Sequence, residues 1–460
     1  MQTENHREPT PNVTKVAAVA LVATTIEWYD FFLYGIAAAL IFSKVFFPAE
    51  MTPLTALLAS FGTFAVGFLA RPLGGVVFGH FGDRLGRKRA LVVALALMGV
   101  STTLIGALPG YAAIGIAAPL LLVILRFAQG LAIGGQWGGA MLLAVESAPK
   151  EKRGFYGSFA QVGAPLGVIL ANLAVLLVSA SMSDEAFMAW GWRIPFLISI
   201  VLLGVAVYVQ SSLEESPEFK QLEALAKARR EAAVTATTAA GGLGASDVAQ
   251  EDALVSSPVL LAIKQHWREI LLAAGAFIAI QVAFYMFVAF VVAYGANPAM
   301  LGLDRNMMLF AVLIGALAMI PSIFLSAMYS DRHGRRGVYL LGACMLGGWA
   351  FALFPLIDTG EFLWITLAVV VGQIFVGMMY GPQAALFAEL FGTKVRYSGA
   401  SLGYQVGAIL GGAFAPMIAT SLLVSFGNPF PIGVYISAAC VVTIVSMLMI
   451  KETYQTGLSE

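Results

Sequence analysis

Four ionisable residues stand inside long apolar runs, and their types and spacing suggest proton and anion chemistry. They are Glu27, Asp30, Arg71 and Arg126, all in the first half of the chain. An ionisable group inside a bilayer costs at least a few kcal/mol, so such groups persist where function requires them. We therefore expect these four residues to carry the chemistry of the protein.

The two acids share one face of a helix. Glu27 and Asp30 are three residues apart, and Tyr34 follows four residues later. Buried carboxylates at this spacing can bind and release a proton. The alternative is that both acids pair with Arg71 and Arg126 in a neutral, inert cluster. The two interpretations are compatible, because protonating one acid would free one arginine. We predict proton coupling at Glu27 and Asp30, with Arg126 in the relay.

Arg126 lies in the segment LRFAQGLAIGGQWGGA, with Gln129 and Gln136 on about the same helix face. Arginine stays charged and can bind a carboxylate through two parallel hydrogen bonds. The segment predicts a substrate or proton-relay contact at Arg126, and a salt bridge to the first helix is the alternative. Arg71, just before Pro72, is predicted to serve structure or gating.

The other candidate substrate contacts are neutral. They are polar or aromatic residues on the expected helices: Tyr34, Gln129, Gln136, Gln161, Gln281, Tyr285, Gln373, Tyr380 and Gln405. Any one of them could instead make a hydrogen bond between helices.

Composition indicates an all-α integral membrane protein. Apolar residues make up 59% of the chain and charged residues 11%, and the mean hydropathy is +0.85. A soluble domain carries about 25% charged residues, and a spanning helix needs about 20 apolar ones. Twelve such runs are expected, at about 16–42, 54–82, 90–109, 113–145, 155–179, 192–211, 267–294, 307–330, 337–357, 362–390, 397–424 and 429–450.

A long polar break divides these runs into two groups of six. We expect an N-terminal half at 1–213, a partly disordered central loop at 214–266 and a C-terminal half at 267–460. Lys and Arg concentrate in the even-numbered connections, which predicts that both termini and the central loop face the cytoplasm.

The two halves are copies of one unit. QVGAPLG at Gln161–Gly167 returns as QVGAILG at Gln405–Gly411, 244 positions later. The loops FGDRLGRKR and YSDRHGRR place Asp83 and Asp331 248 positions apart. Two parallel repeats in so apolar a chain predict a transporter that rocks around a site between its halves.

Charges near the cytoplasmic helix ends predict a latch between the halves. The candidate gating residues, besides Arg71, are Asp83, Arg84, Arg87, Glu146, Asp331, Arg332, Arg335, Glu389 and Arg396. Breaking these contacts should bias the balance between inward and outward opening rather than abolish binding.

Other functional classes find no support in the sequence. Cys344 and Cys440 lie in apolar runs, which suggests neither a disulfide framework nor a metal site. The four histidines fall in tails, loops or helix ends, so no enzyme site assembles, and no cofactor is expected. The basic loops are too short to bind nucleic acid.

Several segments carry a resemblance to a known family. GHFGDRLGRKR and LRFAQG resemble signatures of the major facilitator superfamily. TTIEWYDFFLYG, WGWRIPFL and AELFGTKVRYSGASLGYQ are similar to its metabolite:proton symporter branch, which includes shikimate, α-ketoglutarate and proline/betaine permeases. Gln136 departs from that branch, which usually has Glu there, and Ala327 replaces an expected glycine in the second loop.

The resemblance implies proton symport of a small metabolite by a bacterial plasma-membrane protein. A hydroxylated or keto carboxylic acid, such as shikimate or a dicarboxylate, is the expected substrate. The alternatives are an osmolyte such as proline or betaine, and a sugar. Small molecule, protons and membrane lipid are the expected partners, and the protein is expected to be a monomer.

Overall fold

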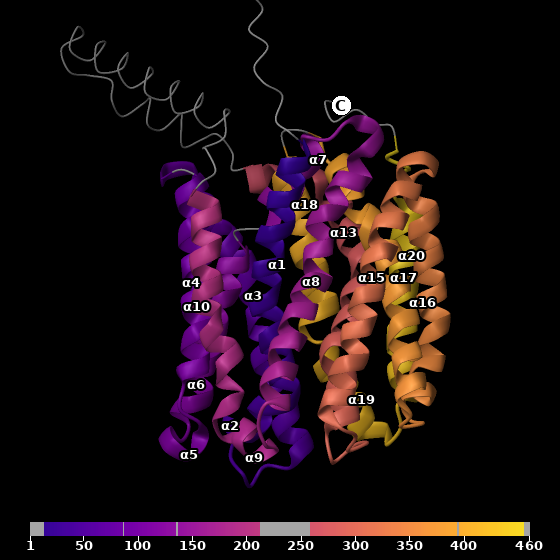
Figure 1. Cartoon of the computed structure of the whole chain (residues 1–460). Coiled ribbons are helices and arrows are strands. Elements are labelled where there is room, and N and C mark those ends of the chain that lie inside the picture. The colour runs from indigo at the N-terminus through magenta and orange to yellow at the C-terminus, as the bar shows by residue number, and fades with distance from the viewer. Residues whose placement is uncertain (1–12, 86, 135–136, 212–257, 393–394, 455–460) are drawn as a thin grey trace, which may run out of the picture.

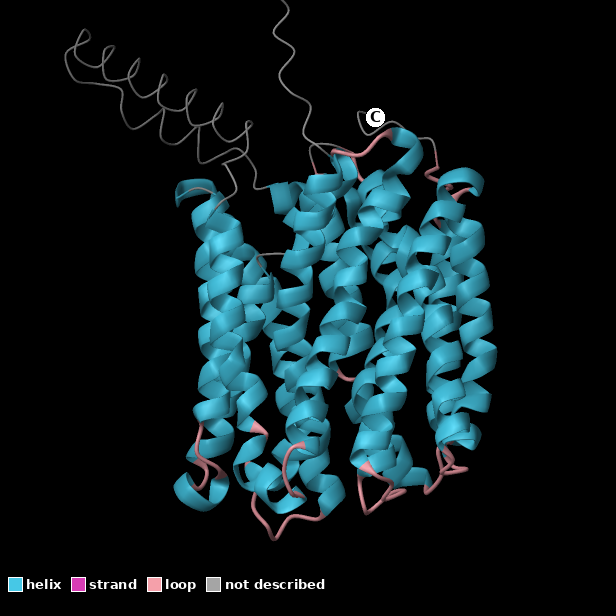
Figure 2. Cartoon of the chain, in the orientation of Figure 1, coloured by secondary structure: helices cyan, strands magenta, loops and turns pink. Residues whose placement is uncertain are grey.

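The computed structural model describes residues 13–85, 87–134, 137–211, 258–392 and 395–454, including most of their side chains. Every regular element in these ranges is a helix (Figure 2). The long helices stand side by side in one bundle (Figure 1).

The N-terminal half contains six long helical segments, some of which are interrupted. Its elements are α1 (Val13–Ala37), π-helical η1 (Ala38–Phe42), α2 (Ser43–Val45), α3 (Pro53–Leu85), α4 (Arg87–Ala107), α5 (Tyr111–Ile114), α6 (Ala117–Gly134), α7 (Trp137–Glu146), 3₁₀-helical η2 (Lys150–Lys152), α8 (Arg153–Ala180), α9 (Asp184–Ala186), π-helical η3 (Phe187–Gly191) and α10 (Arg193–Ser211).

The C-terminal half repeats this plan. Its elements are α13 (Pro258–Tyr285), π-helical η4 (Met286–Phe290), α14 (Val291–Ala296), α15 (Arg305–His333), α16 (Arg335–Ile357), α17 (Phe362–Leu390), α18 (Arg396–Ala408), π-helical η5 (Ile409–Ala413), α19 (Ala415–Phe426) and α20 (Phe430–Met449).

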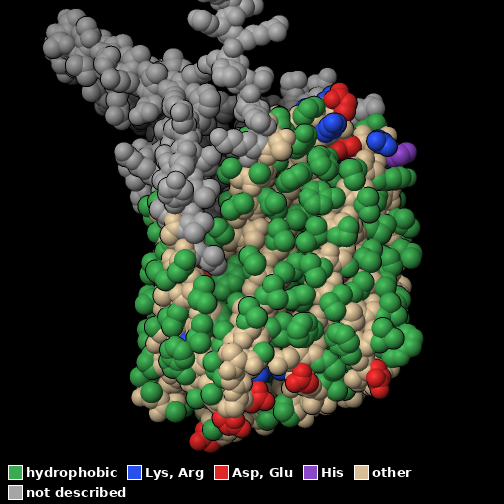
Figure 3. Space-filling model, in the orientation of Figure 1, with side chains coloured by type: hydrophobic (Ala, Val, Ile, Leu, Met, Phe, Trp, Pro, Cys, Tyr) green, Lys and Arg blue, Asp and Glu red, His purple; other side chains and the backbone are tan. Residues whose placement is uncertain are grey.

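The surface of the bundle suits a lipid bilayer. In the described ranges, ten helical segments are long and apolar enough to cross a membrane, and α4 and α10 supply the remaining two expected spans. Large apolar side chains such as Leu177 and Leu363 are about 70% exposed on this surface. Figure 3 shows hydrophobic side chains over the middle of one face, with the charged ones near its two ends.

Helix packing follows the sequence repeat. In the N-terminal half α1 packs on α8, α3 on α6, and α4 on α10. The equivalent pairs in the C-terminal half are α13 with α18, α15 with α17, and α16 with α20. The halves meet where α8 contacts α15 and α17, and where α3 contacts η5 and α19. This confirms the predicted fold of two pseudo-symmetric halves.

Glycines let α3 and α6 approach backbone to backbone. A Cβ on Gly130 would collide with the carbonyl oxygen of Gly67, and one on Gly134 would collide with that of Arg71. A Cβ on Gly67 would meet the guanidinium of Arg126 at 2.5 Å. Small residues at such a contact allow close packing in a membrane, and here the contact holds Arg71 and Arg126 near each other.

Two π-helical turns occupy equivalent places in the repeat. η1 begins at Ala38 and η4 at Met286, so their offset is 286 − 38 = 248, the same as that between Asp83 and Asp331. The seventh span, expected from 267, is preceded by further helix, since α13 begins at Pro258 and kinks at His266. Most of the predicted central loop, 214–257, lies outside the described residues.

Candidate functional site

The four charged residues singled out from the sequence are all buried. Glu27 and Asp30 of α1 are 4% and 2% exposed, while Arg71 of α3 and Arg126 of α6 are fully buried. Within the described part of the chain, neither acid forms an ion pair within 4.0 Å of an arginine or lysine. The structure therefore does not show the alternative arrangement, in which both acids form salt bridges with Arg71 and Arg126.

Arg126 is held by aromatic rings and one glutamine. Its guanidinium carbon lies 4.2 Å from the ring centre of Phe31, 4.1 Å from that of Tyr34 and 4.8 Å from that of Phe64. Such cation–π contacts stabilise a desolvated cation by about 2 kcal/mol or more. Nη1 also donates a hydrogen bond of 3.1 Å to Gln129 Oε1. The structure thus brings together three of the predicted contacts: Tyr34, Arg126 and Gln129.

Asp30 faces the interior of the N-terminal half. Its Oδ1 accepts a hydrogen bond of 2.7 Å from the hydroxyl of Ser199 on α10. Nearby, Gln129 Nε2 donates to the hydroxyl of Thr102 on α4, at 2.7 Å. Asp30 is therefore surrounded by neutral hydroxyl groups, whereas Glu27 lies within electrostatic reach of Arg71. The two acids share a helix but have different surroundings.

Arg71 lies at the centre of the molecule rather than with the latch charges. Its guanidinium carbon is 4.4 Å from the ring centre of Phe31 and 4.3 Å from that of Phe68, with Trp28 further away at 5.7 Å. None of its three guanidinium nitrogens has a hydrogen-bond partner. Glu27 Oε1 is likewise without one. Burying hydrogen-bond donors without partners destabilises the folded protein, unless a bound ligand accepts their hydrogen bonds.

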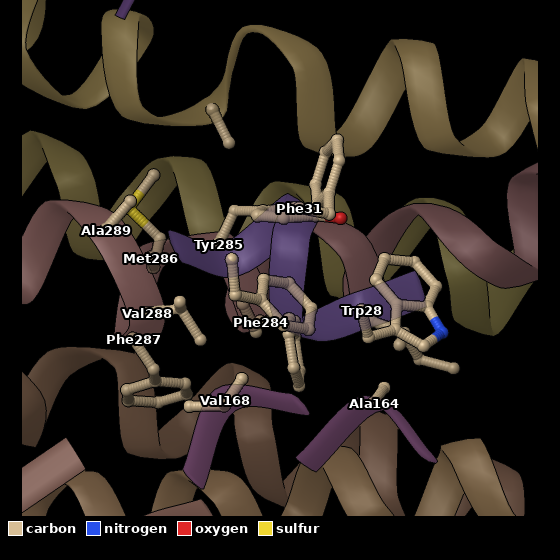
Figure 4. Close-up of a cluster of buried hydrophobic side chains, with 14 of the residues drawn as sticks. Trp28, Phe31, Ala164, Val168, Phe284, Tyr285, Met286, Phe287, Val288 and Ala289 are labelled. Carbon is tan, nitrogen blue, oxygen red and sulfur yellow. The ribbon is translucent and has the colours of Figure 1, made fainter. Parts of the chain in front are cut away.

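A small pocket lies beside this cluster, between the halves. Its lining residues are Trp28, Phe32, Ala164, Ile280, Gln281, Phe284, Tyr285 and Tyr380. Figure 4 shows Trp28 and Phe31 of α1 facing Phe284 and Tyr285 of α13, with Ala164 of α8 alongside. Gln281 Nε2 and the Tyr285 hydroxyl have no hydrogen-bond partner. The pocket therefore has aromatic walls and two spare polar groups from the C-terminal half.

The remaining predicted contacts lie elsewhere. Gln161 Nε2 donates to Gln383 Oε1 at 2.8 Å and to the Tyr380 carbonyl at 3.3 Å, which joins α8 to α17 across the halves. Gln373 packs against Gly315 of α15 and does not line the pocket.

Two of the predicted contacts remain to be placed. Gln405 on α18 is buried, and its Oε1 has no hydrogen-bond partner. Gln136 falls outside the described residues.

At the face where α7 ends and α18 begins (Figure 1), a polar network joins the halves. The Asp331 carboxylate accepts hydrogen bonds of 2.8 Å from the backbone N–H groups of Gly154 and Phe155, at the start of α8. A carboxylate at a helix N-terminus is favoured by the helix dipole. A Cβ on Gly154 would lie 2.7 Å from Asp331 Oδ1 and 2.9 Å from the Ala327 carbonyl oxygen. Glycine at this position permits the contact, although Ala327 replaces the glycine expected in the loop.

Further ion pairs complete this network. Arg335 Nη1 bonds Asp331 at 2.6 Å and its Nη2 bonds Glu389 at 3.0 Å, all within the C-terminal half. Arg396 Nη1 reaches across to Glu146 at 3.0 Å.

Four latch candidates are not part of this described network. Arg332 is exposed. The side chains of Asp83, Arg84 and Arg87 lie outside the described residues.

Several residues that take part in these contacts were not predicted from the sequence. Near the chain end, the Glu452 carboxylate accepts hydrogen bonds from the backbone N–H groups of Arg335 and Arg336, and the Thr453 hydroxyl donates to Glu389. These residues come after the last apolar run, where no periodic pattern marks them. Phe31, Phe64 and Phe68 were missed as well. The signal for Phe31 is the aromatic run WYDFF around Asp30, whereas Phe64 and Phe68 lie outside that run, in the segment before Arg71.

The opposite face also has contacts between the halves. Arg305 Nη2 lies 2.6 Å from Asp184 Oδ1, and its guanidinium stacks on the Phe187 ring. The Ser179 hydroxyl donates to Asn306 Oδ1 at 2.7 Å. Polar contacts therefore join the halves at both ends of the molecule, with the pocket between them.

Comparison with known proteins agrees with this architecture. The family model described as "Sugar (and other) transporter" matches residues 16–460. The chain belongs to this family, within the major facilitator superfamily. It is 40% identical to the inner membrane metabolite transport protein YhjE of Escherichia coli K12, over 99% of this chain and 98% of the relative. It is also 40% identical to the shikimate transporter of the same organism, over 95% and 94%.

Two more distant matches are a transporter of another substrate class and a solved structure of the same fold. A proline/betaine transporter of Salmonella typhimurium is 32% identical, over 95% of this chain and 83% of the relative. A partially occluded, inward-open structure of the xylose transporter XylE from E. coli superimposes with a TM-score of 0.72 at 18% identity, covering 97% of this chain and 99% of that one. That likeness shows the fold. The resemblance to metabolite transporters of the superfamily is confirmed, and the protein is a multi-pass membrane transporter rather than an enzyme.

For this transporter, Asp331→Asn should loosen the face at which α7 ends and α18 begins. The amide removes the charge that caps α8 and that pairs with Arg335, so we expect the closed arrangement to lose about 1–3 kcal/mol. Labelling of a single cysteine at Ser158, with Cys344 and Cys440 replaced, measures the opening. Asp184→Asn is the matched control on the opposite face, where the carboxylate is 80% exposed and should matter less. Unchanged labelling in Asp331→Asn would contradict the latch.

Proposed function

We propose that this transporter is a proton-coupled symporter that imports a small carboxylic acid by alternating access. The substrate class is a hydroxylated or keto acid, such as shikimate or a dicarboxylate. One observation carries this proposal: two fully buried arginines have unpartnered guanidinium nitrogens beside a pocket between the halves. Arginine recognises carboxylates through just such donors.

The buried acids supply the proton coupling in this proposal. Glu27 lies within electrostatic reach of Arg71 but makes no ion pair with it. A charged Glu27 competes with a substrate carboxylate for Arg71, and a protonated Glu27 does not. Proton binding and substrate binding therefore favour each other, which is the thermodynamic requirement for symport. Asp30, bonded to Ser199, is a second proton site within the same half.

The alternating-access part of the proposal uses the contacts at both faces. The Asp331 and Glu146 contacts join the halves at one face, and the Arg305–Asp184 pair joins them at the other. Rocking would break one set while keeping the other. The moving units are the halves 1–213 and 267–460, linked by the loop 214–266. We propose a monomer in a bacterial inner membrane, with lipid around it and both termini in the cytoplasm.

An osmolyte is the second candidate. Trp28, Phe32, Phe284 and Tyr285 give the pocket aromatic walls, and aromatic walls attract quaternary ammonium groups. Relatives named as proline/betaine transporters support this candidate. The arginines oppose it, because a fixed cation repels a cationic group.

Uptake by purified protein in proteoliposomes tests the proposal. Shikimate, 2-oxoglutarate, glycine betaine and xylose would each be offered with and without an inward proton gradient. We expect an acid to accumulate only with the gradient, and its entry to be accompanied by a measurable rise in external pH. Accumulation of glycine betaine or xylose with no acid uptake would overturn the assignment.

A further inference from the structure

We propose that Arg71 and Tyr285, which come from opposite halves, form the clamp that binds the substrate carboxylate. This rests on the proposed function and deepens it, because it names the residues of the anion site. Arg71 lies on α3 and Tyr285 on α13, and the Tyr285 hydroxyl is close enough to the Arg71 guanidinium for a weak, poorly aligned hydrogen bond between them. A carboxylate held by both would bridge the halves directly.

The unpartnered atoms point to this pair. All three guanidinium nitrogens of Arg71 and the hydroxyl of Tyr285 are buried, and none of them makes a well-aligned hydrogen bond. An unsatisfied buried polar group costs about 1–3 kcal/mol, and more when it is charged. The Tyr285 ring lies 5.0 Å from that of Phe68, which itself stacks on Arg71. The donors thus converge from two sides on one place.

Arg126 is less suited to this role. Its ring contacts and its hydrogen bond come from α1, α3 and α6, all in the N-terminal half. Gln129, which accepts its hydrogen bond, is itself fixed to Thr102. Gly67 packs against the same guanidinium and leaves no space on that side. Arg126 Nε and Nη2 also lack partners, but the hydrogen bond to Gln129 holds Arg126 within its own half. Arg71 makes no such bond and is the arginine in hydrogen-bonding range of the Tyr285 hydroxyl.

The surroundings of the clamp define the substrate further. Gln281 lines the pocket and its Nε2 has no partner, so it can donate to a hydroxyl or keto oxygen. Trp28, Phe32 and Phe284 supply flat apolar walls. Arg71 and Arg126 both have unpartnered nitrogens, but of the two only Arg71 makes no well-aligned hydrogen bond among the described residues. The site therefore suits a monocarboxylate whose compact body stacks on aromatic rings, better than it suits a dicarboxylate.

The test separates charge from the forked shape of arginine. Wild type, Arg71→Lys, Arg71→Gln, Tyr285→Phe and Arg126→Lys would be purified, and binding of shikimate and of its uncharged methyl ester would be measured by titration calorimetry. Binding of 2-oxoglutarate and succinate would be measured in the same way. Arg268→Gln, an exposed cation on α13, is the control for a general loss of positive charge.

We expect Arg71→Gln to weaken shikimate binding about 10- to 100-fold, the range for a lost hydrogen bond to a charged group. Binding of the ester should change little in that variant. Arg71→Lys and Tyr285→Phe should give intermediate losses for the acid alone, and Arg126→Lys a smaller one. Equal weakening of acid and ester, or no weakening, in a folded Arg71→Gln protein would overturn the clamp. Tighter wild-type binding of either dicarboxylate than of shikimate would overturn the monocarboxylate assignment. If the wild type binds no acid at all, the proposed function fails first.

Discussion

Glu27→Gln is expected to abolish substrate accumulation against a gradient while preserving exchange of substrate for substrate. The amide resembles a permanently protonated acid, so it leaves Arg71 available to the substrate but can no longer release a proton. Loading proteoliposomes with unlabelled acid and following entry of labelled acid measures exchange. A pH step across the same membranes measures gradient-driven accumulation. Glu27 is 4% exposed and Oε1 has no hydrogen-bond partner, so the substitution loses no contact of that atom.

Asp30→Asn is the comparison for this experiment, because Asp30 bonds to Ser199 within one half. Loss of accumulation in Glu27→Gln together with normal accumulation in Asp30→Asn would place coupling at the Glu27–Arg71 contact. The reverse result would place coupling at Asp30. Full gradient-driven accumulation in both single variants would exclude coupling on α1.

Gly130→Val is expected to cause the largest loss of stability of any single change considered. A side chain at this position would collide with the Gly67 carbonyl oxygen and would lie 2.7 Å from the Ala70 Cβ. The helices α3 and α6 would have to separate, which overpacks the contact and costs about 1–3 kcal/mol, or more where backbone is struck. Thermal unfolding followed by size-exclusion chromatography of the detergent-solubilised protein would show the loss.

Gly348→Val provides the matched control. Gly348 lies inside α16, and a Cβ there would meet no atom within 4 Å. Both substitutions place the same β-branched residue inside a helix, so the difference between them isolates the helix contact from helix propensity. If the two variants unfold at the same temperature, close approach of α3 and α6 does not stabilise the fold.

Much of the fold could be predicted because its determinants are local or periodic. Apolar runs of bilayer length are visible in any single segment, and the recurrence of QVGAPLG as QVGAILG revealed the duplication without any contact information. The relation between the pairs α1–α8 and α13–α18 follows from that duplication. Breaks within spans were not predicted. The π turns at Ala38–Phe42 and Met286–Phe290 lie in apolar runs with no Pro or Gly to mark them.

The site was only partly predictable. The apolar runs show which charged residues are buried, but they do not show which side chains those residues contact. The cost of charge in a bilayer correctly singled out Glu27, Asp30, Arg71 and Arg126 as buried. Electroneutrality suggested salt bridges, yet the arginines lie against rings of Phe31 and other aromatic side chains. Which ring faces a guanidinium depends on helix rotation and packing between segments far apart in sequence. A one-dimensional pattern does not contain that information.

The paired π turns have a consequence for the history of the chain. A π turn accommodates one extra residue in a helix, and such turns are frequent at functional sites. η1 and η4 occur at the same offset as the two loop aspartates, with 248 residues between them. One insertion before the ancestral gene doubled explains both turns, whereas two independent insertions would have had to hit matching sites. The widened turn would then be older than the differences between the halves, including the placement of Glu27, Asp30, Arg71 and Arg126 in the first of them.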